Sequence, residues 1–268
     1  MAFYDVHPKN KPKGPVVLYV PGFAADAFTE LPSLSSIARK GRRAIAVDAP
    51  HGIPSKKIPP FTEAECREAA AILRMLDEKR LKKVDAIGHS AASLYLTTAA
   101  LLDTKRRFRI LVLLSPAGLL KHDSPLKLMY RSVKDAVIDM ACRIPRLFSK
   151  THRRKAQKES SRFIRLLVHQ LPIVCHLGLT VSEIDTMGHG YIVHRLRQLR
   201  RQGIRIVIIQ TTGDRMYPPS RLLLRSDCYD ALLHVPGNHN GPIERPDFFM
   251  NAAVKAIEKI EQRKKQRS

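Results

Sequence analysis

The chain reads GHSAA at residues 88–92, between the apolar run VDAI at 84–87 and a small-residue, apolar segment at 91–102. The first run has the composition of a short buried strand and the second that of a helix. A serine at such a junction lies on a tight turn at the carboxyl end of the strand, where a substrate can reach its hydroxyl. Taken alone, Ser90 could equally be the N-cap of the helix.

Two later strands supply partners for a serine nucleophile. A hydroxyl needs a base to take its proton and a carboxylate to orient that base. The apolar run 204–210 is followed by TTGD, which ends at Asp214, and the run 231–235 is followed by PGNH, which ends at His239. The order Ser90, Asp214, His239 therefore predicts a catalytic triad. The adjacent His89 is expected to point elsewhere, into a pocket wall or the packed interior.

Four pieces of the chain, taken in order, resemble the α/β-hydrolase superfamily. They are the strand and loop at 16–23, the strand and loop at 44–52, the serine turn, and the loops that carry the acid and the base. The resemblance runs from about residue 16 to the C-terminal helix and is weak at about 121–202. It implies a lid-bearing serine hydrolase of esterase or lipase type, with the lid inserted over the active site.

The resemblance also implies further site residues. The backbone N–H groups of Phe23 and Ala91 would form the oxyanion hole, and Asp48 would structure a loop. Some members place the acid one strand earlier, but the loop at 115–118 holds no carboxylate, which favours Asp214. The serine turn ends in Ala92 where the family usually has glycine, and only about fifteen residues precede the first clear strand, so the first hairpin is expected to be short or missing.

Alternating patterns predict an α/β fold with a mainly parallel sheet flanked by helices. Strands are expected near 16–20, 44–48, 84–88, 110–114, 204–210 and 231–235, and helices near 31–40, 62–81, 90–103 and 246–262, with a frayed tail at 263–268. The alternation of strands and helices stops between the strands at 110–114 and 204–210, where helices alone are expected, near 125–143, 150–169 and 190–201. We therefore expect a hydrolase core at 1–118 and 203–268, and a helical lid at 119–202.

Composition restricts the class of protein. The 268 residues suffice for one sizeable core, and the four cysteines are scattered without a C-x-x-C pair, which is typical of reduced thiols. The basic N-terminus lacks a signal core, and no apolar run reaches the ~18–20 residues that span a bilayer. A cytoplasmic location is expected. The spacings between the histidines do not match those of a metal site. The sequence contains no glycine-rich phosphate-binding loop, so a nucleotide cofactor is not implied.

The net charge of +23 is high for a hydrolase, and residues 121–201 hold 17 Lys and Arg against 6 Asp and Glu. A solvated basic face is the simplest interpretation. A more specific interpretation is that the basic lid makes peripheral contact with anionic membrane. The absence of interleaved aromatic residues argues against nucleic acid as a partner.

The sequence thus predicts hydrolysis of a small-molecule carboxylic ester or thioester, with a lipid-like acyl substrate as the finer expectation. Two alternatives stay open. The same triad could serve an acyltransferase, or the protein could be an inert, membrane- or polyanion-binding relative. Peptidase and carbon–carbon hydrolase chemistry also remain open on this fold.

Overall fold

The computed structural model describes residues 3–23, 25, 27–47, 58–120, 124, 127–128, 130–131, 134–135, 138, 177–189 and 191–266. Asp48, the expected helix at 150–169 and most of that at 125–143 lie outside this part of the chain.

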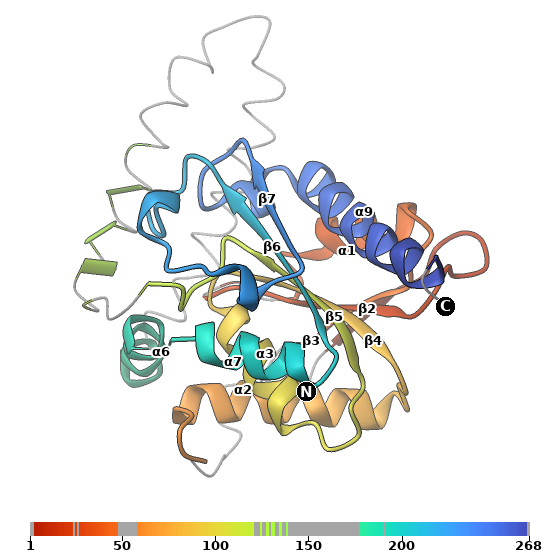
Figure 1. Cartoon of the computed structure of the whole chain (residues 1–268), viewed down its shortest axis with the longest axis horizontal. Coiled ribbons are helices and arrows are strands. Elements are labelled where there is room, and N and C mark those ends of the chain that lie inside the picture. The colour runs from red at the N-terminus through yellow and green to blue at the C-terminus, as the bar shows by residue number, and fades with distance from the viewer. Residues whose placement is uncertain are drawn as a thin grey trace, which may run out of the picture.

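A seven-stranded sheet forms the centre of the molecule (Figure 1). Its strands lie side by side in the order β1-β3-β2-β4-β5-β6-β7, and every pairing is parallel except that of β1 with β3. The strands are β1 (Phe3–Val6), β2 (Val16–Val20), β3 (Ala44–Val47), β4 (Val84–His89), β5 (Phe108–Leu114), β6 (Arg205–Thr211) and β7 (Ala231–Val235).

Helices cover both faces of the sheet (Figure 1). One face packs against α2 (Glu63–Glu78), α3 (Ala92–Leu102), α6 (Leu177–His189) and α7 (Val193–Arg201). The other packs against α1 (Leu31–Arg39) and α9 (Pro246–Lys265). The short helix α8 (Gly241–Glu244) and two 3₁₀ turns, Pro219–Arg221 and Ser226–Cys228, complete the elements.

Residue alternation along the strands explains the two cores. In β5, Leu111 and Leu113 belong to the core under α2 and α3, while Ile110, Val112 and Leu114 belong to the core under α1 and α9. Successive side chains of a strand point to opposite faces, so a strand buried on both sides must be apolar throughout. This is why the parallel strands were recognisable as short apolar runs.

The fold class predicted from the sequence is confirmed, and each of the six expected strands is present. Three differences are informative. The edge strand β1 and helix α6 were not expected, and α9 continues to Lys265, which corrects the prediction that the chain frays from 263. Helix α7, which lies within the range expected for the lid, packs into the same core as α2 and α3 through Leu196 and Leu199.

Candidate active site

Ser90 lies on the tight turn between β4 and α3. Its φ is +54°, a left-handed conformation that is costly for a residue with a side chain. Its N–H donates to the Leu114 carbonyl at 3.0 Å, which ties the turn to the end of β5. A Cβ on Gly88 would lie 2.6 Å from Leu96 Cδ1, so glycine there lets α3 pack directly on the strand that carries the serine.

His239 bridges Ser90 and Asp214. Its Nε2 is 2.9 Å from Ser90 Oγ, and its Nδ1 is 3.0 Å from Asp214 Oδ2. All three residues are at least 95% buried within the described chain. The carboxylate can only accept, so Nδ1 carries the hydrogen and Nε2 is left free to accept the serine proton. The sequence predicted that these three residues would meet, and the structure brings them within hydrogen-bond distance.

Asp214 is held by several donors. Tyr217 N–H donates to Oδ1 at 2.8 Å, and Gln210 Nε2 donates to Oδ2 at 3.2 Å. Burial alone would raise the pKa of Asp214, but the neighbouring His239 and hydrogen bonds from His239, Tyr217 and Ser115 outweigh it and hold the pKa below its usual value. The carboxylate therefore stays ionised and can orient the imidazole.

His89 has a positioning role that sequence analysis missed. Its Nε2 lies 2.9 Å from the backbone carbonyl of His239. Because a carbonyl only accepts, His89 donates, and the bond fixes the backbone of the loop that carries His239. Burial, with a smaller contribution from His239, lowers the pKa of His89 to about 3, so the imidazole is neutral. The GHS sequence placed this residue beside the serine, but its bonding partner is 150 residues away.

The expected oxyanion donors lie on the two loops around Ser90. Gly22 contacts the serine turn closely, since a Cβ placed on it would lie 3.0 Å from the His89 carbonyl oxygen and 3.4 Å from Ser90 Cβ. Phe23 follows Gly22, and Ala91 follows Ser90. Among the hydrogen bonds of the described residues, none uses the N–H of Phe23 or Ala91.

The loop after Asp214 is tied to the segment that follows β5. Arg215, which follows Asp214 in the sequence, pairs with the buried Asp135 at 3.0 Å. Arg131 Nη1 donates to the Met216 carbonyl at 2.7 Å. The part of 127–138 that is described therefore lies against the loop that carries the acid.

Neither a metal nor a membrane span is suggested by the described residues. They contain no group of three or more His, Cys, Asp or Glu side chains placed to hold a metal ion. In the same part of the chain, no helix is long and apolar enough to cross a bilayer.

Comparison with known proteins places this arrangement in a family. A model described as the alpha/beta hydrolase family matches residues 17–252, which include the serine, the acid and the base. The chain belongs to the alpha/beta hydrolase family. A comparison with curated proteins found no match.

Solved structures of alpha/beta hydrolase type share the fold at low sequence identity. An esterase from Thermogutta terrifontis is 19% identical with a TM-score of 0.67, and the match covers 97% of this chain and 93% of the esterase. An enol-lactonase from Burkholderia xenovorans is 16% identical with a TM-score of 0.64, covering 96% of each chain. A meta-cleavage product hydrolase from Pseudomonas fluorescens is 18% identical with a TM-score of 0.65, covering 96% and 94%. At this identity the likeness establishes the fold.

Proposed function

We propose that this protein is a serine hydrolase that cleaves a small carboxylic ester or thioester through an acyl-enzyme. The observation that carries the proposal is the bridge by His239, which joins Ser90 Oγ at 2.9 Å and Asp214 Oδ2 at 3.0 Å. Membership of the alpha/beta hydrolase family supports the hydrolase class.

The proposed reaction uses this geometry. Ser90 Oγ attacks the carbonyl carbon while its proton passes to His239 Nε2. The N–H groups of Phe23 and Ala91 stabilise the oxyanion that forms, at about 3–4 kcal/mol per donor. Collapse expels the alcohol or thiol, which takes the proton from His239. Water then attacks the acyl-enzyme and gives a proton to His239. Collapse of the second tetrahedral intermediate breaks the bond to Ser90 Oγ, which takes this proton back from His239 Nε2, so the acid is released and the Ser90 hydroxyl is restored.

We also propose that residues 119–202 include a lid. The contacts of Arg131 with the Met216 carbonyl and of Asp135 with Arg215 support this, because they bring the segment to the loop that carries Asp214. A cover there would exclude water and shape the acyl pocket. The basic stretch 144–165, on which contact with anionic membrane would depend, lies outside the described residues.

A fluorophosphonate probe tests the serine directly. We expect a single covalent adduct on the wild-type protein by intact mass and none on Ser90→Ala, with loss of ester hydrolysis of the order of 10⁴-fold or more. Activity on an acyl-chain series, with and without an alcohol acceptor, separates a hydrolase from an acyltransferase. A folded wild-type protein that neither reacts nor turns over esters would contradict the proposal and favour an inert binding protein.

A further inference from the structure

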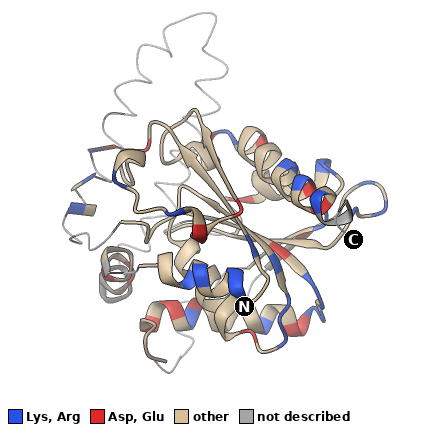
Figure 2. Cartoon of the chain, in the orientation of Figure 1, with Lys and Arg blue, Asp and Glu red and all other residues tan. Residues whose placement is uncertain are grey.

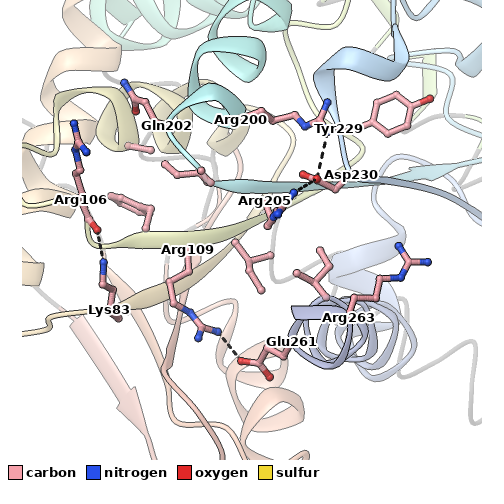
Figure 3. Close-up of a pocket in the computed structure, with 16 residues that line it drawn as sticks. Lys83, Arg106, Arg109, Arg200, Gln202, Arg205, Tyr229, Asp230, Glu261 and Arg263 are labelled. Atoms are coloured by element: carbon pink, nitrogen blue, oxygen red, sulfur yellow. Dashed lines mark hydrogen bonds and ion pairs between the residues drawn. The ribbon is translucent and has the colours of Figure 1, made fainter. Parts of the chain in front are cut away.

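A hollow lies at the opposite edge of the sheet from Ser90. It has a volume of about 870 Å³ and opens where β4, β5 and β6 begin, beside the last turns of α9 (Figure 3). The serine, the acid and the base all follow the carboxyl ends of their strands, so the length of β6 separates the two sites by roughly 20 Å. The hollow is therefore distinct from the candidate active site.

The lining of this hollow is strongly basic. It holds six cationic side chains and two acidic ones: Lys83, Arg106, Arg109, Arg200, Arg205, Arg263, Asp230 and Glu261. Figure 2 shows Lys and Arg on the loops that lead into these strands and at the end of α9. Its volume falls within the range of pockets that bind small molecules, roughly 300–1,000 Å³.

Internal ion pairs neutralise only part of this charge. Arg109 donates to Asp85 and Glu261 at 3.0 and 2.6 Å, and the buried Arg42 also pairs with both acids, which leaves this set of four balanced. Arg200 and Arg205 share a single carboxylate, Asp230, at 3.3 and 2.9 Å. That second set keeps one excess positive charge.

Three cations at the rim add to this excess. Lys83, Arg106 and Arg263 are exposed, and no carboxylate of the described chain is found in an ion pair with any of them. The only polar contact recorded for Lys83 Nζ among the described residues is the Arg106 carbonyl, at 2.9 Å. Figure 3 shows Lys83 and Arg106 across the hollow from the Asp230 set, and Arg263 below that set, on α9. Cations from several directions thus surround one concave space.

We propose that this hollow binds a small molecule that carries a chain of two or three phosphates. Guanidinium groups donate two parallel hydrogen bonds and match phosphate geometry, and several of them around one hollow match several adjacent anionic groups. The floor is apolar, formed by Phe108, Ile110 and Ile204, with the Tyr229 ring at the side. This floor can accept an uncharged part of the ligand, as in a nucleoside polyphosphate.

A small ligand is favoured over single-stranded nucleic acid. Such chains bind through exposed aromatic rings on which successive bases stack. None of the large exposed hydrophobic side chains of the described chain lines this hollow, and Tyr229 is half-buried. The positive charge therefore surrounds a pocket that lacks exposed aromatic rings for stacking successive bases.

Two triple variants test the proposal with equal changes of charge. The site variant combines Lys83→Gln, Arg106→Gln and Arg263→Gln. The control combines Lys9→Gln, Lys82→Gln and Arg201→Gln, which are exposed cations that do not line the hollow. Isothermal titration with inorganic tripolyphosphate and with ATP is carried out at 150 mM NaCl, where diffuse attraction is screened beyond about 8 Å. Thermal melting confirms that both variants are folded.

We expect one bound tripolyphosphate per wild-type chain, at least 10-fold weaker binding in the site variant, and less than a threefold change in the control. Tighter binding of ATP than of tripolyphosphate would show that the floor holds the nucleoside. Three outcomes would overturn the proposal: no binding of either probe, equal losses in both variants, or binding of a short RNA at this site in preference to both probes.

Discussion

At the residue scale, Ser90 combines the role of candidate nucleophile with an unfavourable backbone conformation. Its φ of +54° places the residue where only glycine is free of Cβ strain. The turn is held by the Leu114 carbonyl on one side and by α3 on the other, so the surrounding fold maintains the strain. Function and local stability are therefore opposed at this position.

Ser90→Gly is expected to be more stable than Ser90→Ala by about 1 kcal/mol, although both lose the hydroxyl, because glycine relieves the left-handed conformation. Urea unfolding of the two variants measures the difference. Ser93, inside α3, supplies the matched control, since there alanine should be the more stable replacement by about 1 kcal/mol. Equal stability of the two Ser90 variants would show that the turn carries no strain.

His89 makes stability depend on pH. Its pKa is about 3 in the folded chain, against 6.5 as the ordinary value, so below pH 6.5 the unfolded chain binds a proton that the folded chain does not. Stability is therefore lost as the pH falls. Between pH 7.5 and 5.0 this loss amounts to about 2 kcal/mol, at about 1.4 kcal/mol per pH unit below 6.5.

His89→Gln removes this contribution, so the difference in unfolding free energy between wild type and variant should shrink by about 2 kcal/mol from pH 7.5 to pH 5.0. Urea unfolding at the two pH values checks it. His234→Gln makes the same substitution at an exposed histidine and is the matched control. A difference in unfolding free energy between the wild type and His89→Gln that stays constant with pH would refute the prediction.

At the scale of elements, α2 connects helix capping to the packing of α6 and α7. Thr62 Oγ1 accepts from Glu65 N–H at 3.2 Å, and Glu65 Oε2 accepts from Thr62 N–H at 2.8 Å, which is a capping box. The second oxygen of Glu65 accepts from Arg195 of α7, and Thr186 of α6 donates to Thr62 at 2.9 Å. One helix start thus positions three helices.

Replacing Glu65 should be far more costly than replacing its neighbour Glu63. Glu65 is fully buried, and Glu65→Ala leaves Arg195 without its carboxylate, so we expect a loss of about 3–5 kcal/mol in unfolding free energy. Glu63→Ala, an exposed position in the same first turn, should change it by about 0.5 kcal/mol or less. Adding Arg195→Met to Glu65→Ala should recover part of the loss. Similar costs at 63 and 65 would mean that capping alone matters.

The same elements show how far sequence reasoning reaches. The capping box at Thr62 and the apolar parallel strands carry their own signals, so α2 and six strands were predictable. The four-residue β1 carries too little pattern, because it forms by pairing along β3. Helix α6 contains Gly and β-branched residues that disfavour helix, and it is held by contacts such as Glu183 with Arg67 at 2.9 Å. The meeting of Ser90, Asp214 and His239 was predictable from strand order, but the bond from His89 to the His239 carbonyl was not.

At the scale of the whole molecule, the two edges of the sheet differ in chemistry. The carboxyl edge carries the buried bridge of Ser90, His239 and the ionised Asp214, and the amino edge carries the basic hollow. The chain as a whole has 47 Lys and Arg against 24 Asp and Glu. The excess positive side chains repel one another in the folded chain, and unfolding moves them apart.

Salt should therefore stabilise this protein. We expect the melting temperature to rise by several degrees between 10 and 300 mM NaCl, because screening relieves repulsion among the excess cations, and about 1 kcal/mol corresponds to roughly 2–4 °C in a domain of this size. Calorimetry at fixed pH measures the rise. The charge-reduced variant Lys9→Gln, Lys82→Gln, Arg201→Gln should show a smaller one, because it removes repulsion and no ion pair of the described chain. A melting temperature that falls with salt would mean that ion pairs such as Arg109 with Asp85 outweigh the repulsion.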